Sequence, residues 1–195
     1  MHIFSHRINT VELLKETPMK YGVEIDIRSY GNKLILHHDP FKEGTAFTEW
    51  LAAYKHAGII LNVKEEGLEI KILELMDEYK ITDFFFLDQS FPFLRQTAQS
   101  GEHRCSVRIS EHENIETVMS LAGMISWVWV DCFTKFPLTK NQVSCLKDAG
   151  FKLCIVSPEL QGRTQIKEVS LFRYHLESLN IKGDAVCTKY ANLWI

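Results

Sequence analysis

The sequence lacks the features that mark secreted, membrane and nucleic-acid-binding proteins. Its five cysteines are odd in number and form no CxxC pair, which favours reduced thiols in a cytoplasmic protein over a disulfide framework or a zinc site. Residues 1–10 show no basic segment followed by an apolar one, so we expect no secretory signal. No apolar run approaches the ~18 residues of a membrane span. A net charge of −3 without a long basic run favours neither nucleic acid nor a stable membrane association.

Nucleotide-binding motifs and linkers are also missing. Neither GxGxxG nor GxxxxGK[ST] follows any apolar run, and no segment rich in Pro, Gly or Ser divides the 195 residues. The composition, 46% hydrophobic and 24% charged, is ordinary for a globular protein that buries a single core. We therefore expect one domain spanning residues 1–195, and the sequence gives no indication of its oligomeric state.

What the sequence does contain is a regular alternation of short apolar runs and amphipathic segments. Six glycines, at 22, 58, 101, 123, 150 and 183, stand between an amphipathic segment and the next apolar run, where a chain leaving a helix often needs positive φ. The alternation predicts a (β/α)8 TIM barrel, with a doubly wound open sheet as the alternative. The eight predicted strands are Ile3–Ser5, Val23–Ile27, Ile59–Val63, Phe84–Leu87, Ser106–Ile109, Trp127–Val130, Leu153–Val156 and Ala185–Thr188.

One departure from the alternation follows the second predicted strand. Gly31 and Asn32 separate Val23–Ile27 and its polar continuation from a further apolar run, Leu34–Leu36. A Gly-Asn pair between two such runs is a hairpin signal. The sequence thus predicts a β-hairpin after strand two, before the chain enters its next helix.

Polar residues gather where the predicted strands end, and the C-terminal ends of barrel strands are where such folds carry their chemistry. Glu24 and Asp26 are two residues apart on one strand and so share a face, as do Asn62 and Lys64 on the next strand. If that face is the barrel interior, carboxylate and amide oxygens converge, and these are ligands that Mg2+ and Ca2+ prefer. The alternative is a solvated strand face, or ion pairing of the two carboxylates with Arg28 or Arg7.

Taken in chain order, His6-Arg7, Glu24-Ile25-Asp26 and His38-Asp39 resemble the HR…ExD…HD pattern of the glycerophosphodiester phosphodiesterase family. The predicted hairpin lies between the second and third of these motifs, as a similar short turn does in that family. The resemblance extends over nearly the whole chain but is specific only in the first 64 residues. Among looser matches, Asn9-Thr10 resembles the NT that opens the family's first helix. The others are Leu61–Lys64, Gln89–Phe91, Cys187–Tyr190 and Leu193-Trp194.

The resemblance implies a metal-dependent phosphodiesterase that hydrolyses a small, water-soluble glycerophosphodiester-like substrate. It implies one divalent cation, Mg2+ or Ca2+ with Mn2+ as a third candidate. Histidine suits acid/base catalysis because its unperturbed pKa of ~6.5 lies near neutral pH. The implied roles are general acid/base for His6 and His38, metal ligation for Glu24, Asp26 and Asn62, and substrate or phosphate binding for Arg7, Lys64, Arg108, Asp131 and Trp129.

Three departures separate this chain from the family pattern. The segment between His6-Arg7 and Asn9-Thr10 is short, and Asn62 stands where the family usually has an acidic metal ligand. Lys189, near the C-terminus, stands where the family usually has an acidic residue. An amide oxygen carries no charge, so we expect weaker metal binding or help from another group such as Asp131. The alternative function is a catalytically impaired or non-catalytic barrel that binds a phosphate-containing ligand. For Trp129 the alternative role is core packing.

Overall fold

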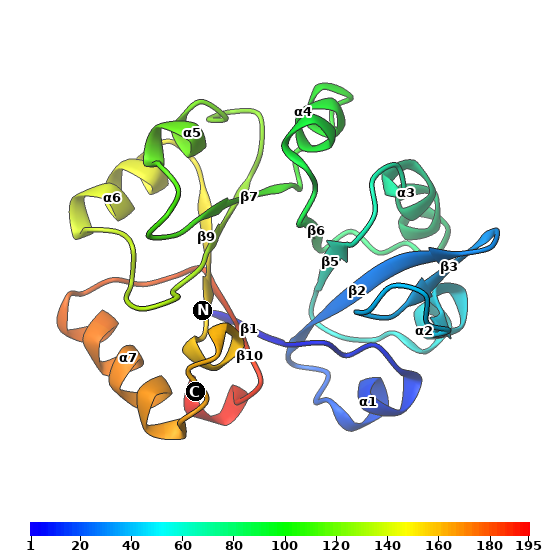
Figure 1. The fold of residues 1–195 in the computed structure, drawn as a ribbon, viewed down its shortest axis with the longest axis horizontal. Coiled ribbons are helices and arrows are strands. Elements are labelled where there is room, and N and C mark those ends of the chain that lie inside the picture. The colour runs from blue at the N-terminus through cyan, green and yellow to red at the C-terminus, as the bar shows by residue number, and fades with distance from the viewer.

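Eight parallel strands stand at the centre of the molecule, and seven α-helices surround them in the computed structural model, which describes residues 1–195 (Figure 1). Two 3-10 turns complete the fold, η1 (Pro158–Gln161) and η2 (Ala191–Leu193), the second in the position of an eighth helix. The strands are β1 (His2–Ser5), β2 (Gly22–Tyr30), β3 (Lys33–Leu36), β4 (Thr45–Ala46), β5 (Ile59–Val63), β6 (Phe84–Leu87), β7 (Ser106–Ile109), β8 (Trp127–Val130), β9 (Lys152–Val156) and β10 (Ala185–Thr188). The helices are α1 (Val11–Glu16), α2 (Phe47–Ala53), α3 (Glu69–Glu78), α4 (Phe91–Gln99), α5 (Ile115–Met119), α6 (Lys140–Asp148) and α7 (Ile166–Ser178).

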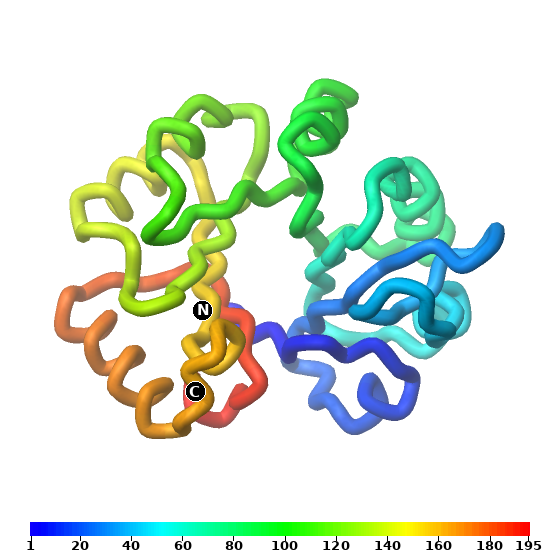
Figure 2. Tube along the Cα trace, in the orientation of Figure 1, coloured from blue at the N-terminus to red at the C-terminus, as the bar shows by residue number.

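The central strands follow one another around the barrel in chain order. In Figure 2 the first strand, in blue, runs beside the last, in red, and the two pair in parallel from His2 with Ala185 to Ser5 with Thr188. Parallel ladders join every other neighbouring pair except β6 and β7. Those two strands meet only at a single bridge between Phe86 and Cys105. The predicted barrel is therefore present, but its sheet is not closed by a ladder at the β6–β7 seam.

The sequence located most of these elements. Five of the eight predicted strands have the observed bounds, and the other three differ only in extending further. The predicted hairpin is confirmed, with β2 and β3 pairing antiparallel from Ile27 with Leu36 to Tyr30 with Lys33. The sequence pattern predicts no helix over Phe91–Gln99, where the structure has α4 with Pro92 in its first turn. Proline is tolerated there because the first N–H groups of a helix have no intrahelical partner.

The glycine prediction was right for four of its six positions. Gly58, Gly101, Gly123 and Gly150 have positive φ, whereas Gly22 and Gly183 do not. At Gly22 the reason for glycine is close packing: a Cβ atom there would stand 2.4 Å from ring carbons of Phe4. The explanation from helix ends was wrong for this glycine, since Phe4, its partner on the adjacent strand β1, leaves no room for a side chain.

Two hydrophobic clusters account for the core. The larger one, of 41 buried residues, fills the layer between strands and helices. The smaller one, of 10 residues, lies inside the barrel, where Phe85 stacks on Trp127 with ring centroids 4.5 Å apart and contacts Phe4 edge to face. Trp129 belongs to this inner cluster and is 5% exposed. We call this inner cluster the apolar plug. It fills the barrel below the C-terminal ends of the strands, so the polar residues occupy the C-terminal end of the barrel.

None of the helices combines the length and apolar character that crossing a bilayer requires.

Candidate active site

The chain makes a sharp turn directly after β1. Arg7 has a φ of 56°, in the left-handed region that a residue with a side chain seldom adopts. In this conformation the Arg7 backbone N–H donates a hydrogen bond of 2.7 Å to Oε2 of Glu24. Such strain is stored where the surrounding structure fixes it, and it clusters at functional sites. Here it directs His6 and Arg7 to the mouth of the barrel beside the second strand.

Glu24, Asp26 and Asn62 form a buried layer just above the apolar plug. Their exposed fractions are 1%, 0% and 6%, and Asp26 and Asn62 are direct partners in the β2–β5 ladder. The amide Nδ2 of Asn62 donates to Oε1 of Glu24 at 2.8 Å. The reading of Glu24 and Asp26 as a solvated strand face is wrong, because both carboxylates point into the barrel.

Asn9 makes two hydrogen bonds to Asp26, one to its side chain and one to its backbone. Its Nδ2 donates to Asp26 Oδ2 at 2.8 Å, and its Oδ1 accepts the Asp26 backbone N–H at 2.9 Å. The sequence associated Asn9 only with the start of the first helix, so this contact was missed. The asparagine fixes the orientation of a buried carboxylate, which makes it a positioning residue for the site.

Positive charge reaches the same layer from Lys64 and Arg7. The Nζ atom of Lys64 lies 3.2 Å from Oδ1 of Asp26 and 3.3 Å from Oδ2 of Asp88. The Nε atom of Arg7 lies 3.8 Å from Oδ2 of Asp26. A lysine and an arginine at the rim of a buried carboxylate pair form a clamp that an anionic ligand could use.

The side chains of this layer carry oxygen atoms of the kind that could hold a divalent cation. Oδ1 of Asn62 is buried and has no hydrogen-bond partner, and a buried acceptor left unpaired calls for an explanation. Oδ1 of Asp26 also accepts no hydrogen bond, but it faces the Lys64 amine at 3.2 Å. No group of three His, Cys, Asp or Glu side chains is arranged to hold a metal ion. The residues that could hold a cation are two carboxylates and one amide, whose oxygens are hard ligands of the kind that Mg2+ and Ca2+ take.

Burial and neighbouring charges shift the pKa values of Glu24 and His6 in opposite directions. Burial, followed by the neighbouring Asp26 carboxylate, raises the pKa of Glu24 to about 7. Burial, followed by the charge of Arg7, lowers the pKa of His6 to about 3. The His6 Nε2 atom lies 3.8 Å from Glu24 Oε2, and its buried Nδ1 has no partner. His6 is thus a neutral imidazole with an unused ring nitrogen beside the carboxylates.

His38 sits on the loop that follows the hairpin strand β3. Its Nδ1 is 2.7 Å from Oδ1 of Asp39, which lowers the pKa of the Asp39 carboxyl. The loop is anchored by Arg28, which donates two hydrogen bonds, of 2.9 and 3.1 Å, to the backbone carbonyl of His38 and also pairs with Glu65. Arg28 therefore holds the His38 loop, and the interpretation that it pairs with Glu24 or Asp26 was wrong.

On the opposite side of the mouth, Arg108 is held between two carboxylates. Its guanidinium bonds both Asp88 and Asp131, and Gln161 donates to the other oxygen of Asp131. Asp131 is fully buried, and this burial raises its pKa to about 6 although Arg108 opposes the shift. The resemblance implies substrate or phosphate binding for Arg108, but two carboxylates already compensate its charge.

Replacing Asp131 with asparagine is expected to flatten the dependence of stability on pH. A carboxyl whose pKa is raised on folding contributes stability below its unfolded value, and that contribution is lost as the pH rises through about 6. A shift of two pKa units corresponds to at most ~3 kcal/mol. Urea unfolding at pH 4.5 and 7.5 measures the free energy of unfolding of both proteins. Between these two pH values, the free energy of unfolding of wild type should fall by about 1–3 kcal/mol more than that of Asp131→Asn. The exposed control Asp77→Asn should follow wild type, and parallel profiles for Asp131→Asn would contradict the prediction.

Comparison with known proteins identifies the architecture. No protein-family model matches the chain, and no curated protein sequence does. Two solved structures match over nearly the whole chain. A glycerophosphodiester phosphodiesterase from Agrobacterium tumefaciens str. C58 has a TM-score of 0.69 and 12% identity, covering 100% of this chain and 97% of its own. The chain has the glycerophosphodiester phosphodiesterase fold. A glycerophosphoryl diester phosphodiesterase from Parabacteroides distasonis ATCC 8503 gives a TM-score of 0.65 at 12% identity, covering 98% and 84%.

In this glycerophosphodiester phosphodiesterase fold, the residues predicted from the ordered motifs meet at the mouth of the barrel. His6, Glu24, Asp26, Asn62 and Lys64 form one contiguous group. His38 lies on the rim, in contact with Asp39. Arg108 and Asp131 join the group through Asp88 and Lys64, while Trp129 packs in the inner core. The polar residues that the sequence did not assign to the site are Asn9, Asp88 and Gln161.

Proposed function

We propose that the protein is a metal-dependent phosphodiesterase that hydrolyses a water-soluble glycerophosphodiester-like substrate to an alcohol and a phosphomonoester. The observation that carries the proposal is the group of two carboxylates, an unpartnered amide oxygen, a lysine and a neutral histidine at one end of the barrel. The fold that this chain shares with two glycerophosphodiester phosphodiesterases adds support. Fold alone does not determine chemistry, so the residues must carry the argument.

The residues divide into those that hold a cation and those that hold the phosphate. Glu24, Asp26 and Asn62 would ligate one Mg2+, Ca2+ or Mn2+ ion, which supplies Lewis acidity at a phosphoryl oxygen when bound. Arg7 and Lys64 flank Asp26 at 3.8 and 3.2 Å. Both can turn toward a phosphate oxygen and stabilise the charge that is redistributed during the reaction.

The two histidines suit opposite sides of a proton transfer. His6 is neutral because burial and Arg7 lower its pKa, so it can accept a proton. A bound phosphodiester places negative charge near the ring, which favours the protonated form and raises the pKa toward the working range. His38 is half exposed, and its Nδ1 is held by Asp39. The carboxylate fixes the ring and leaves Nε2 available to a substrate oxygen.

We also propose a reducing, cytoplasmic location and a small-molecule ligand for this protein. All five cysteines are unpaired, and four of them are buried. Burial raises the pKa of the Cys105 thiol to about 12, which makes this thiol unreactive. A folded core that contains unpaired thiols suits a compartment in which disulfides do not form.

A second candidate function is a non-catalytic barrel that binds a phosphate-containing ligand. The observation that favours it is the Lys64 amine, 3.2 Å from the oxygen of Asp26 that a cation would contact. This amine already supplies positive charge to the carboxylate layer, while Asn62 supplies none in place of a third acid. A barrel of this kind would bind a phosphodiester through Arg7 and Lys64 without cleaving it.

One assay separates the two functions. Glycerophosphodiester hydrolysis is measured with Mg2+, Ca2+ or Mn2+, and again with excess chelator, while binding of the intact diester is followed by calorimetry. We expect turnover that is lost on chelation and restored by one of the three ions. Binding without turnover under every metal condition would establish the non-catalytic alternative. Turnover that survives chelation would refute the role of Glu24, Asp26 and Asn62 as cation ligands.

A further inference from the structure

The β6–β7 seam contains a cavity of about 300 Å³. Below it, the single bridge at Phe86 and Cys105 ends the contact between the two strands, and the Ser106 hydroxyl donates to the Phe86 carbonyl at 2.7 Å. Above this point the strands separate, and side chains from β6, β7 and helices α4 and α5 line the space between them. We call this space the seam pocket; its lining residues include Asp88, Phe91, Leu94, Val107, Arg108, Glu113 and Thr117.

The seam pocket adjoins the candidate active site. Asp88 lines the pocket and contacts Lys64 at 3.3 Å, and Lys64 in turn lies 3.2 Å from Asp26. A smaller cavity of about 160 Å³ is lined by Lys64 and shares Asp88 and Gln89 with the seam pocket. A diester whose phosphate sits at Lys64 can therefore extend one of its two alcohol groups past Asp88 into the seam.

Two buried polar atoms beside this path have no hydrogen-bond partner. Oε1 of Gln89 and Oγ of Ser90 are buried and have no partner, although Nε2 of Gln89 donates to Glu69 and Thr97. Unpaired buried polar atoms are uncommon in folded proteins. Next to a cavity that opens toward a binding site, such atoms are candidates to bond a hydroxyl group of a ligand.

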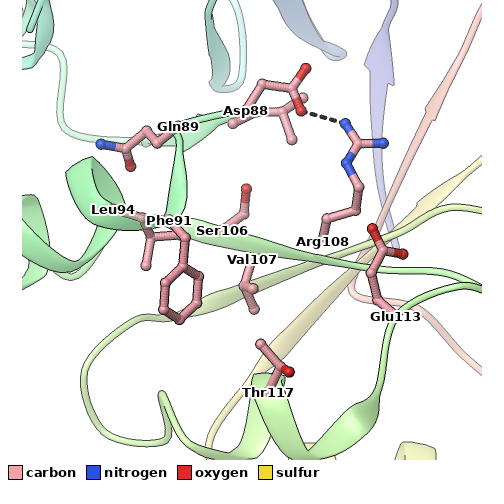
Figure 3. Close-up of a pocket in the computed structure, with 10 residues that line it drawn as sticks. Asp88, Gln89, Phe91, Leu94, Ser106, Val107, Arg108, Glu113 and Thr117 are labelled. Atoms are coloured by element: carbon pink, nitrogen blue, oxygen red, sulfur yellow. Dashed lines mark hydrogen bonds and ion pairs between the residues drawn. The ribbon is translucent and has the colours of Figure 1, made fainter. Parts of the chain in front are cut away.

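The two sides of the pocket differ in chemistry. Figure 3 shows Asp88 and Arg108 joined by an ion pair on one side, with Glu113 nearby, and Phe91, Val107 and Thr117 on the other. Phe91, an aromatic residue of this wall, is 43% exposed. An apolar wall with an aromatic ring facing a polar wall suits a ligand that has an apolar face and polar edges.

The charges exclude an anionic group from the pocket. Arg108 is compensated by Asp88 and Asp131, while Glu113 adds a carboxylate whose bonding partner is the neutral hydroxyl of Ser110. The balance of charge around the cavity is therefore negative. A second phosphate or a carboxylate placed here would meet repulsion in a partly desolvated space, whereas an uncharged alcohol would not.

We propose that the seam pocket binds the second alcohol of the diester, opposite the glycerol side, and selects an uncharged ring-bearing alcohol with hydroxyl groups at its edge. The proposal rests on the proposed phosphodiesterase function. Phe91 packs against the ring face, and Asp88 and Gln89 bond the edge hydroxyls. The pocket is thus a specificity site formed because the barrel sheet is not closed between β6 and β7.

The proposal can be tested by a substitution at an exposed residue that places a larger side chain in the seam pocket. Thr117 lies on α5, is exposed and lines the pocket, whereas its exposed neighbour Glu116 does not line it. Thr117→Trp and the control Glu116→Trp are compared on two glycerophosphate diesters, one of a cyclic hexol and one of methanol. We expect Thr117→Trp to lower kcat/KM for the ring diester roughly tenfold or more relative to the methyl diester. Glu116→Trp should leave the ratio of the two kcat/KM values at its wild-type value.

A second variant removes the proposed wall without filling the space. Phe91→Ala should reduce the preference for the ring diester, and Phe91→Tyr should retain it. An equal effect of Thr117→Trp on both diesters, or none on either, would overturn the seam pocket proposal. If the wild-type protein hydrolyses neither diester, the proposed function fails, and calorimetric binding of the intact diesters then tests the pocket separately. Equal affinity of wild type for both diesters would overturn it in that case.

Discussion

Replacing His6 with alanine is expected to lower kcat for a glycerophosphodiester roughly 10²- to 10⁴-fold, the usual contribution of a positioned general acid or base. His6 lies 3.8 Å from Glu24, is neutral and has a buried ring nitrogen without a partner. Its loss removes the proton-transfer group and leaves the phosphate clamp of Arg7 and Lys64 in place. The reduction should therefore appear in kcat, with KM changed much less.

The control lies on the same strand. His2 is at the other end of β1 and is exposed, so His2→Ala should have wild-type kinetics. Measurements with a nitrophenyl leaving group assign the direction of proton transfer. A variant that loses the general acid regains activity on a leaving group that needs no proton, whereas a variant that loses the base does not. If His6→Ala retains wild-type kcat on every substrate, His6 has no part in the chemistry.

The same comparison applies to His38 and its neighbour. His38 is held at Nδ1 by Asp39, whereas His37 bonds the Asp39 backbone. His38→Ala should therefore lower kcat and His37→Ala should not. With the leaving-group comparison, these variants determine which histidine donates the proton and which accepts it.

Much of the barrel could be predicted from sequence because its strands are buried on both faces. Runs such as Phe84–Leu87 and Trp127–Val130 have apolar residues at every position, and every residue in them is buried. The helix α4 was not predicted because it is only nine residues long and has Pro92 in its first turn, and a proline in a short segment is more often a sign of a turn than of a helix. The open seam could not be predicted, because β6 is wholly apolar like β8, and β7 contains two polar residues like β1, and both β8 and β1 pair in ladders.

The residues of the site also divide into two kinds: those that local sequence spacing predicts and those whose roles depend on contacts between distant parts of the chain. The ExD spacing placed Glu24 and Asp26 on one face because strand geometry has a period of two residues. Asn9 and Asp88 were missed because their roles depend on contacts with Asp26 and Lys64, 17 and 24 residues away along the chain. The NT pair at Asn9-Thr10 was a signal for Asn9, but it was interpreted only as the start of a helix.

Replacing Asn62 with aspartate is expected to make the stability of the protein strongly dependent on metal. The change removes the hydrogen bond from Nδ2 to Glu24 and adds a third carboxylate to a layer in which Glu24 and Asp26 are already buried. Without a cation, an uncompensated buried charge costs about 3–5 kcal/mol. In chelator the variant should therefore melt well below wild type. The Asn32→Asp control adds the same charge in the exposed hairpin turn and should melt like wild type.

Added Mg2+ or Mn2+ should reverse the deficit of Asn62→Asp, because a cation that binds only the folded state stabilises it in proportion to the logarithm of its concentration. Three carboxylates hold a divalent ion more strongly than two carboxylates and an amide, so the metal concentration for half-maximal activity should fall at least tenfold, ~1.4 kcal/mol. If the melting temperatures of wild type and Asn62→Asp are both independent of metal, no cation binds at Glu24, Asp26 and residue 62. Lys64 would then be the principal positive charge beside Asp26, as the non-catalytic alternative requires.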